Sequence, residues 1–347
     1  MTDPVISVVI PVYNASTTIE ACLQALAAQN RLPLEVIVVD NGSSDGTTQQ
    51  VQSMVEEFPC SLRLLEKRTR GAAAARNHGI RAAAGEWIAF TDSDCVPDPD
   101  WLETGEALLA EHGSRIAALA GPAWGTLEGD AAARVLGLSS LSVDMPEQLY
   151  DSAGATGTLG FAAANLWVRR KALLDLQGFD ESLHIAGEDI DLCARLYAAS
   201  GRICYSPALR VRHIHSSGTI AMCRKMVQYG CAHATLFARH GTPGIHVDMP
   251  VAGQLHLPVP ASIWCNLASA EKKTLVLLLV SLWQPWLLVL VPIYLYWIGH
   301  GLCRRAAKLD KTCRPAEPFY LGMLLVVKST AITWGRIRGS HRGVWVC

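Results

Sequence analysis

Two aspartates, Asp92 and Asp94, flank Ser93 directly after an apolar run in this chain of 347 residues. Carboxylate oxygens are the ligands that Mg²⁺ and Mn²⁺ prefer, and phosphate oxygens can complete the coordination shell. The pattern is therefore suited to holding a divalent cation on a bound diphosphate. Asp-rich turns without a metal also occur at strand ends, so the pattern alone does not define a site.

A second acidic cluster, made of Glu188, Asp189 and Asp191, stands at the start of an amphipathic segment. The helix dipole stabilises acidic groups in that position, which is their structural interpretation. Their chemical interpretation is a general base that deprotonates an acceptor hydroxyl. Two alternating histidines, His213 and His215, follow on a strand-like segment and are suited to contact with a metal or a diphosphate.

The elements that must position these residues alternate between strand and helix over the first 90 residues. This order predicts a parallel, right-handed, doubly wound sheet. Ligands bind such sheets at the carboxyl ends of the strands, where Tyr13, Asp40 and Asp92 stand here. The expected strands cover residues 5–12, 34–40, 62–65 and 86–90, and an Ala-rich helix is expected over 72–84.

Beyond residue 116 the pattern is mixed. Strands are expected over 117–123, 160–169, 203–205 and 209–213, and helices over 131–141, 171–176, 189–200 and 219–240. Glycine and proline are frequent from residue 241 to 260, which is typical of a linker. The predicted organisation is a catalytic domain over 1–240, a linker over 241–270, a hydrophobic segment over 271–303 and a basic tail over 304–347.

Composition and charge narrow the classes further. The chain is 50% hydrophobic and 18% charged, which excludes a mainly disordered protein. Residues 1–270 carry 19 Lys and Arg against 28 Asp and Glu, whereas residues 271–347 carry 11 against 3. A basic, apolar tail suggests contact with an anionic membrane surface. Nucleic acid is not an expected partner, because the basic residues alternate with apolar ones.

The segment Thr274–Leu302 has 29 residues and no formal charge. As a straight helix it would extend roughly 43 Å, against about 30 Å for the hydrocarbon core of a bilayer. Pro285 and Pro292 could break it into a hairpin that enters and returns, and basic flanks on both sides favour this over a single tilted span or a buried helix. Phe319–Gly335 predicts an interfacial helix, with a short span as the alternative.

The eleven cysteines include no CxxC pattern and stand mostly in apolar runs. We expect small core residues in a reducing compartment rather than metal ligands or disulfides. The first residues lack the charged start and long apolar stretch of a signal peptide, so the body is expected in the cytoplasm.

Together these motifs resemble those of family 2 glycosyltransferases, which have the GT-A fold, and the resemblance covers most of residues 5–240. It implies an α/β fold with a Rossmann-like, mostly parallel sheet and helices on both faces, followed by a C-terminal helical, membrane-associated segment. The donor half is similar in Ile6–Asn14, Val38–Thr47, Gly71–Gly79 and Asp92–Asp94. The acceptor half is similar in Ala164-Asn165, Gly178–Glu181, Glu188-Asp189 and His213.

For the donor, the resemblance implies that Tyr13 and Asp40 hold the base and that Arg76 contacts the base or a phosphate. Asp92 would contact the ribose or the metal. The implied donor-binding residues are Pro11, Tyr13, Asp40, Arg76, Asp92, Ser93 and Asp94.

For the chemistry, the resemblance implies that Asp94 and His213 bind Mn²⁺ or Mg²⁺ at the diphosphate, with His215 as the second choice. Asp189 would be the base in a single displacement that inverts the anomeric carbon. The implied acceptor-side residues are Asn165, Glu188 and Asp191.

The resulting expectation is a non-processive transferase, because none of the ten tryptophans follows an arginine as in the Gln-x-x-Arg-Trp motif of processive synthases. The expected donor is a UDP-sugar, with GDP- and dTDP-sugars left open. The expected acceptor is lipid-linked or a glycan, in envelope polysaccharide or glycolipid assembly at the cytoplasmic face of the inner membrane. A sugar nucleotidyltransferase and a non-catalytic membrane scaffold are the alternatives.

Overall fold

The computed structural model describes residues 5–69, 71–125, 129–139, 145–184, 186–215, 218–250, 253–307, 313–341 and 343–347. The chain forms two compact units. The N-terminal unit comprises residues 1–124, 141–153 and 159–214, and the C-terminal unit comprises 125–140, 154–158 and 215–347. The division therefore falls at residue 214 rather than at the predicted boundary after 240, because the helix over 219–240 packs with the C-terminal helices.

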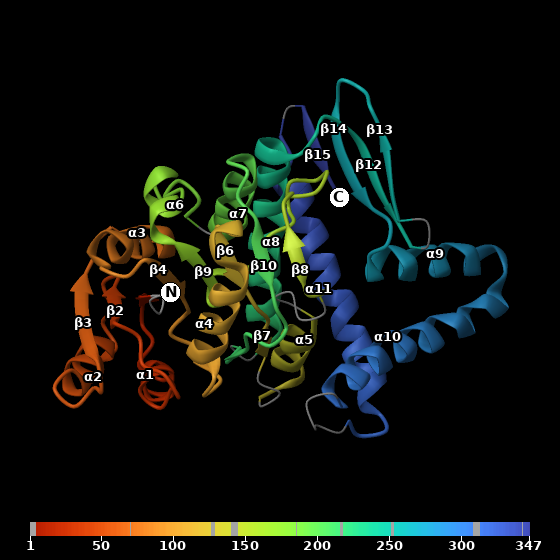
Figure 1. Ribbon diagram of the computed structural model, residues 1–347. Coiled ribbons are helices and arrows are strands. Elements are labelled where there is room, and N and C mark those ends of the chain that lie inside the picture. Colours follow the sequence, from red (N-terminus) through yellow and green to blue (C-terminus); the bar gives the residue numbers. More distant parts are fainter. Residues whose placement is uncertain are drawn as a thin grey trace. The chain divides into compact units, whose positions relative to one another are not determined.

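The N-terminal unit is built on an eight-stranded sheet with the order β3-β2-β1-β4-β9-β6-β10-β8 (Figure 1). The first four neighbours are parallel, as predicted, whereas β9 and β8 run antiparallel to their neighbours. The strands are β1 (Ile6–Val12), β2 (Glu35–Asp40), β3 (Ser61–Glu66), β4 (Trp87–Phe90), β6 (Ala118–Ala120), β8 (Gln148–Tyr150), β9 (Leu166–Arg169) and β10 (Ile203–Tyr205).

Helices cover both faces of this sheet, because its central strands are apolar on both sides. Val8 and Val36 face one hydrophobic core, and Val9 and Ile37 face the other. The first core includes α1 (Ile19–Ala27), α2 (Thr47–Met54) and α4 (Trp101–His112). The second includes α3 (Ala72–Ala82), α6 (Arg170–Asp175) and α7 (Glu188–Ala198). The predicted fold class is thus confirmed.

A second sheet of three strands, β5-β11-β7, stands at the end of the N-terminal unit. The sequence predicted β11 (Val211–His213) but not β5 (Cys95–Pro97), which follows the aspartates directly. The strand expected over 117–123 is two strands, β6 and β7 (Ala123–Gly125). The strand expected over 160–169 is reduced to β9, preceded by the 3-10 turn η2 (Ala163–Asn165).

The C-terminal unit combines helices with a four-stranded sheet of order β13-β12-β14-β15. Its helices are α5 (Ala131–Ser139), α8 (Thr219–His240), α9 (Ala270–Trp283), η3 (Pro285–Val289), α10 (Leu290–Ala307) and α11 (Glu317–Gly339). Its strands are β12 (Gly244–Met249), β13 (Gly253–Leu257), β14 (Ser262–Asn266) and β15 (Val344–Val346). The predicted linker over 241–270 is therefore corrected, since β12 pairs with both β13 and β14 there.

Helices α8 and α11 cross with their backbones almost in contact. A Cβ atom at Gly230 would lie 2.1 Å from the Ile332 carbonyl oxygen, and one at Gly335 would lie 2.1 Å from the Val227 carbonyl oxygen. Only glycine fits at such a crossing, so these positions explain why α11, expected as an interfacial helix, also belongs to the unit's core.

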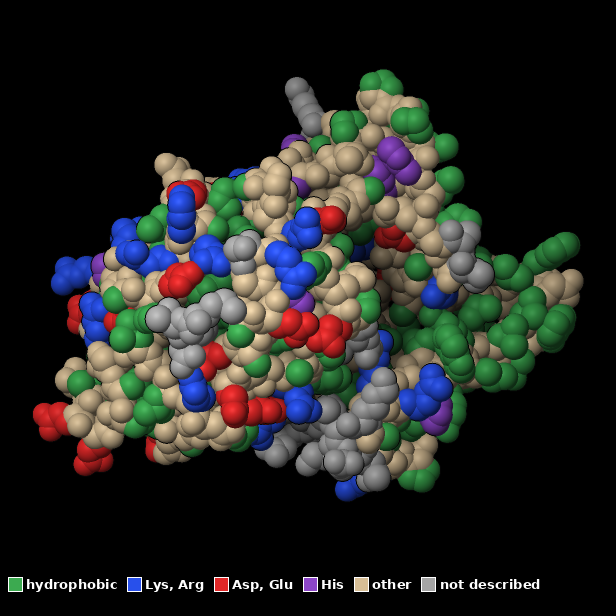
Figure 2. All heavy atoms as spheres, in the orientation of Figure 1, with side chains coloured by type: hydrophobic (Ala, Val, Ile, Leu, Met, Phe, Trp, Pro, Cys, Tyr) green, Lys and Arg blue, Asp and Glu red, His purple; other side chains and the backbone are tan. Residues whose placement is uncertain are grey.

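Helices α9 and α10 form a hairpin that turns at η3. The chain breaks at Pro285 as predicted, but Pro292 lies in the first turn of α10, where its missing N–H interrupts no helical hydrogen bond. Figure 2 shows a continuous hydrophobic surface over these helices, and Leu282 and Trp283 near the turn are 80% and 83% exposed. In the described part of the chain, Pro285–Ala307 is one segment long and apolar enough to cross a membrane.

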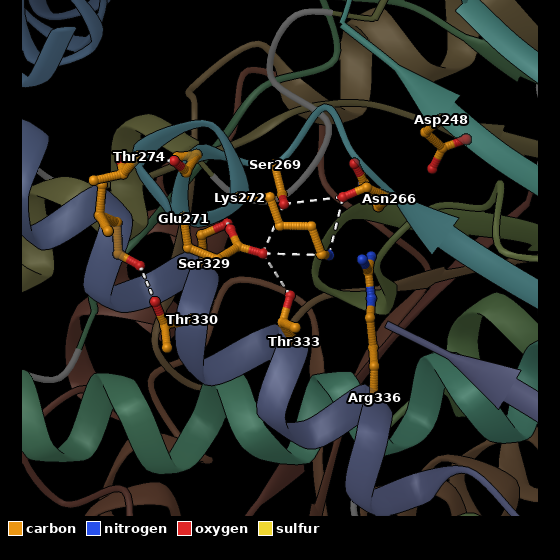
Figure 3. Close-up of polar contacts among 12 residues, drawn as sticks. Asp248, Asn266, Ser269, Glu271, Lys272, Thr274, Ser329, Thr330, Thr333 and Arg336 are labelled. Carbon is orange, nitrogen blue, oxygen red and sulfur yellow. Dashed lines mark hydrogen bonds and ion pairs between the residues drawn. The ribbon is translucent and has the colours of Figure 1, made fainter. Parts of the chain in front are cut away.

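The base of the hairpin is fixed to α11 by the carboxylate of Glu271 (Figure 3). This carboxylate accepts hydrogen bonds from Ser269 Oγ at 2.6 Å, from Thr333 Oγ1 at 2.7 Å and from Ser329 Oγ. Lys272 Nζ donates to the Asn266 carbonyl oxygen at 3.0 Å. A half-buried carboxylate with three hydroxyl donors holds the start of α9 in a defined place on α11.

The cysteines differ in part from the expectation. Those of the N-terminal unit are free and mostly buried, as expected. Cys303 of α10 and Cys313, however, form a disulfide with a Cα–Cα distance of 5.7 Å, which corrects the expectation of no disulfides. The two cysteines are ten residues apart in the sequence, and this spacing matches no disulfide or metal-binding motif that could have predicted the bond.

Candidate functional site

The loops after β1 and β2 are tied together at the carboxyl edge of the main sheet. Asn14, with φ of 49°, accepts the Ser44 amide on Oδ1 at 2.9 Å. The Asp40 carboxylate accepts the amides of Gly42 and Ser43 at 3.0 and 3.1 Å, so it shapes its own turn. Tyr13 is 49% exposed beside this turn, at the position where the sequence predicts a nucleotide base.

Arg76 connects the two acidic clusters. Its Nη2 donates to Asp92 Oδ1 at 2.7 Å and its Nη1 donates to Glu188 Oε1 at 2.8 Å. Its guanidinium also lies over the Phe179 ring, with 5.5 Å to the centroid. Burial alone would lower the pKa of Arg76, but the charges of Asp92 and Glu188 outweigh it and raise the pKa above its ordinary value. In this structure Arg76 thus holds two carboxylates, and its contact with the base or a phosphate of a nucleotide stays a prediction.

Asp94 and His213 come together across the small sheet. His213 is opposite Cys95 in the antiparallel pairing of β11 with β5, and its Nε2 lies 3.6 Å from Asp94 Oδ1. The ligand atoms of Asp94, Cys95 and His213 all lie within 4.8 Å of one another. Burial raises the pKa of the Cys95 thiol well above its usual range, so it is a neutral group beside the carboxylate. Within the described residues, this cluster has the donor set for a divalent cation.

Asp189, the second residue of α7, carries the most shifted carboxyl of the site. Its Oδ2 accepts the Ala163 amide at 3.2 Å and its Oδ1 accepts the Ile190 amide at 2.8 Å. Burial and the adjacent charge of Glu188 raise the pKa of Asp189 to about 7, against the opposing charge of Arg76. Such a carboxylate is a stronger base than an exposed one and is still ionised in part at neutral pH.

Hydrogen bonds of the Asn77 side chain join α3 to the loop before α7. Asn77 Nδ2 donates to the Phe179 carbonyl oxygen and to Glu181 Oε1, and Asn77 Oδ1 accepts the Phe179 amide at 2.8 Å. Gly178 has φ of 73°, and a Cβ there would lie 2.2 Å from Asn77 Oδ1. Glycine is therefore required at this turn, which keeps Phe179 under Arg76.

Two residues predicted on the acceptor side have structural roles instead. Asn165 is buried, donates to the carbonyl oxygens of Pro122 and Leu209 at 3.0 and 2.6 Å, and accepts Trp101 Nε1 at 2.9 Å. Asp191 is 2% exposed and accepts Arg195 Nε at 2.7 Å one turn along α7. Both interactions stabilise the fold, and we correct the acceptor-side assignment for both residues.

The structure thus brings together most of the predicted site. The strands β1, β2 and β4 are parallel neighbours in the main sheet (Figure 1), so their carboxyl ends share one edge. Pro11 lies inside β1 and Ser93 lies between the two aspartates, both partly buried. His215 belongs to the C-terminal unit, where it packs against Gly125.

Two features were missed from the sequence. The link from Arg76 to Asp92 and Glu188 spans 16 and 112 residues, and no local pattern marks such a pairing. Cys95 could have been flagged, since it directly follows the metal-type pattern, but cysteine in an apolar run indicates core packing more often.

This fold and edge geometry define a GT-A-type glycosyltransferase domain. Residues 7–176 match the family described as "Glycosyl transferase family 2". The chain belongs to this family, as its opening strand, its DxD pattern and its acidic helix start led us to expect.

Curated relatives carry related names. The pre-mycofactocin glycosyltransferase of Mycobacterium tuberculosis is 34% identical over 241 residues, which are 68% of this chain and 48% of that protein. Glycosyltransferase AglE of Haloferax volcanii is 40% identical over 114 residues, which are 32% of this chain and 38% of that protein. The chain thus spans half or less of the length of these relatives.

Solved structures share the fold. The mannosyltransferase PcManGT from Pyrobaculum calidifontis, in complex with GDP-Man and Mn²⁺, has a TM-score of 0.55 at 21% identity and covers 96% of this chain and 88% of its own. S. aureus TarS 1-349 in complex with UDP has a TM-score of 0.50 at 24% identity, covering 68% of this chain and 71% of its own. At these identities the likeness shows the fold alone.

Proposed function

We propose that this protein is a membrane-attached, metal-dependent, inverting glycosyltransferase. It transfers one sugar from a nucleotide-sugar, with UDP as the favoured nucleotide, to a hydroxyl of a lipid-linked acceptor. The observation that carries the proposal is that Arg76 bridges Asp92 and Glu188. Asp92 belongs to the DxD pattern, and Glu188 is next to Asp189, whose carboxyl group has a raised pKa. A donor-side and an acceptor-side group are thereby held in one network.

The donor set of Asp94 and His213 fits Mn²⁺ or Mg²⁺. A carboxylate oxygen and an imidazole nitrogen are ordinary ligands of Mn²⁺, whereas the protonated Cys95 thiol is a poor one. When bound, the ion would stabilise the negative charge that develops on the leaving diphosphate. The GDP-Man and Mn²⁺ present in the PcManGT structure support this assignment.

Asp189 supplies the base of the proposed reaction. The acceptor hydroxyl oxygen bonds to the anomeric carbon as the bond from that carbon to the diphosphate oxygen breaks, and the hydroxyl proton moves to the Asp189 carboxylate. A single displacement inverts the configuration at that carbon. The amides of Ala163 and Ile190 orient the carboxylate, and its pKa of about 7 matches a general base that works near neutral pH.

The remaining donor residues shape the nucleotide site. The exposed ring of Tyr13 offers a face for stacking the base, while Asp40 holds the turn that follows β2. The UDP in the TarS complex and the GDP-Man in the PcManGT complex support a nucleotide-sugar donor of either base. UDP remains our favoured donor.

Attachment to the membrane is assigned to the α9–α10 hairpin. Its 14-residue first arm, α9, rises only about 21 Å as a helix, which is too short to cross a bilayer, so the hairpin enters one leaflet and returns. Basic residues at both ends, Lys272 and Arg304 among them, fit an anionic surface. We place the enzyme at the cytoplasmic face of the inner membrane, in envelope polysaccharide or glycolipid assembly.

Calorimetric titration of the detergent-solubilised protein with UDP, GDP and dTDP, each with and without Mn²⁺, tests the donor site. We expect tight binding of one nucleotide that needs the metal and is lost in Asp94→Ala. Cys95→Ser, which alters the neutral neighbour, is the matched control and should retain binding. Metal-independent binding, or none, would contradict the proposal and favour a non-catalytic scaffold.

A further inference from the structure

Helices α8 and α11 enclose an open groove of about 510 Å³ on the surface of the C-terminal unit. Arg224 and Val227 of α8 line one wall, and Trp334 and Arg338 of α11 line the other. The close crossing of the two helices at Gly230 and Gly335 fixes the walls relative to each other. The groove is therefore part of the built structure of this unit.

The groove is cationic. Arg224 and Arg338 are both exposed, and neither has an ion pair within the described residues. No acidic side chain of the described chain lines the groove. Two unneutralised guanidinium groups on facing helices suit an anion with several oxygens, and arginine binds phosphate oxygens in a bidentate manner.

The groove is also apolar along its length. Ile220 at its α8 wall is 70% exposed, and Trp334 at its α11 wall is 59% exposed. Tyr320, Met323 and Val327, all at least 36% exposed, precede Trp334 on the same face of α11 at helical spacing. An apolar stripe thus leads along α11 into the groove, which suits a hydrocarbon chain rather than a small soluble anion.

The groove lies at the level of the hairpin's base. Thr333, which binds the Glu271 carboxylate at the start of α9, directly precedes Trp334 (Figure 3). With the hairpin in a leaflet, the start of α9 lies among the lipid headgroups, and so do Trp334 and Arg338. Tryptophan and arginine are the side chains that favour this interface.

The groove also stands close to the candidate metal centre in the sequence. Thr219, where α8 begins, follows His213 by six residues. This proximity along the chain favours an acceptor over a bulk lipid as the occupant of the groove.

We propose that the α8–α11 groove binds the lipid-linked acceptor, with its phosphate on Arg224 and Arg338 and its chain along Val227 and Trp334. The proposal rests on the proposed function, because it requires a membrane-attached transferase. It adds the chemical class of the acceptor, a single-chain lipid phosphate.

The test is calorimetric titration of the full chain in a neutral detergent with farnesyl phosphate. Farnesol, which lacks the phosphate, and inorganic phosphate, which lacks the chain, are the comparison ligands. We expect each to bind at least about tenfold more weakly than farnesyl phosphate, because a charge-assisted contact exceeds the roughly 1.4 kcal/mol that corresponds to tenfold.

Arg224→Gln combined with Arg338→Gln should weaken farnesyl phosphate binding at least about tenfold and leave nucleotide binding unchanged. Lys225→Gln is the matched control, because Lys225 lies over the Tyr229 ring and not in the groove. Equal losses in the control, or equal affinity for farnesol, would overturn the assignment. So would an unchanged affinity for farnesyl phosphate together with weaker binding to phosphatidylglycerol vesicles, which identifies a bulk-lipid contact.

The two proposals can fail separately. If the protein binds farnesyl phosphate through Arg224 and Arg338 but binds no nucleotide with Mn²⁺, the proposed function is wrong and the assignment of the groove stands. A protein that binds nucleotide with Mn²⁺ but not farnesyl phosphate fails the groove alone.

Discussion

In the N-terminal unit the apolar side chains of the sheet are inside, whereas the C-terminal unit exposes several large apolar side chains and buries two basic ones. Val8 and Val36 of the sheet are fully buried. In the C-terminal unit, Leu282 is 80% exposed while Lys328 and Arg336 are 6% and 7% exposed. The first arrangement is the one that water stabilises, and the second is the one expected of a hairpin that enters lipid, as we propose.

The two units also differ in how they hold a buried arginine. Arg76 is neutralised by two carboxylates, Asp92 and Glu188, as a group that organises charge in a site would be. Arg336 lies 4.4 Å over the Trp264 ring and donates Nε to His233 Nδ1 at 3.2 Å. Burial and the charge of Arg336 lower the pKa of His233 to about 3, so His233 stays a neutral acceptor. One arginine serves electrostatics and the other serves packing.

The largest expected effect tests the chemistry of the N-terminal unit. Asp189→Asn removes the base while keeping the size of the side chain, so we expect sugar transfer to fall by about 10³-fold or more. Nucleotide binding with Mn²⁺ should be nearly unchanged, because the donor groups lie in other loops. Transfer is measured with a radiolabelled donor and binding by calorimetry.

Asp191→Asn is the control for this substitution, since Asp191 is on the same helix and pairs with Arg195. It should lower stability and retain most of the transfer rate per folded molecule. If Asp189→Asn weakened nucleotide binding as much as transfer, Asp189 would be a donor ligand and not the base.

The second prediction tests the exposed apolar side chains of the hairpin in the C-terminal unit. Leu282→Glu combined with Trp286→Glu places two charges near the hairpin turn, where the side chains are 80% and 67% exposed. Each charge in hydrocarbon costs about 2.5 kcal/mol or more, so we expect cosedimentation with anionic vesicles to be lost. Leu34→Glu is the control in the other unit, at a 47% exposed leucine, and should leave vesicle binding intact.

Vesicle binding that survives the double hairpin variant would place the anchor elsewhere, with α11 the next candidate. Its Tyr320 and Trp334 are the exposed aromatic residues to substitute then.

The third prediction concerns stability within the N-terminal unit. Asn165→Leu removes the side-chain partner of the Leu209 carbonyl oxygen and of the Trp101 Nε1 donor, and leaves the Pro122 carbonyl oxygen with the Val211 amide alone. We expect the free energy of unfolding to fall by about 2–4 kcal/mol, measured by urea denaturation. Asn30→Ala, at an exposed contact with Glu103, is the control and should change it by less than about 0.5 kcal/mol. An acceptor KM that rises in folded Asn165→Leu would restore its acceptor role.

The sequence predicted the parts of the fold that depend on local patterns. The strands β1, β2 and β4 are buried on both faces, so their continuous apolar runs were readable, and α8 was predicted at its observed bounds. The strands of residues 244–266 were not, because glycine and proline there mark turns between short strands as well as linkers. The pairing of these strands with one another depends on tertiary structure and not on a local sequence pattern.

The candidate site divides in the same way. The pairing of Asp94 with His213 was implied by the resemblance to the family, and the structure brings the two side chains together where β11 pairs with β5. The partners of Arg76 and Asn165 could not be predicted, because each side chain is satisfied by groups far apart in the sequence. For polar residues in a known motif, the structure is therefore needed to tell those that bind a ligand from those that stabilise the fold.

The smallest expected effect sharpens the contrast between the two buried arginines. Glu188 raises the pKa of Asp189 through its charge, whereas Glu188→Gln keeps an oxygen that can accept from Arg76. Because a neutral neighbour makes ionisation of Asp189 easier, its pKa should fall. We expect the acidic limb of kcat/KM, which rises as Asp189 loses its proton, near pH 7 in the native enzyme and at lower pH in Glu188→Gln.

Glu86→Gln, which alters an exposed ion pair with Arg169, should leave that limb in place. A limb that moves to higher pH in Glu188→Gln would mean that Glu188 acts mainly by positioning Arg76 and not by its charge on Asp189. Arg76 would then act on Asp189 through its own positive charge, which lowers that pKa.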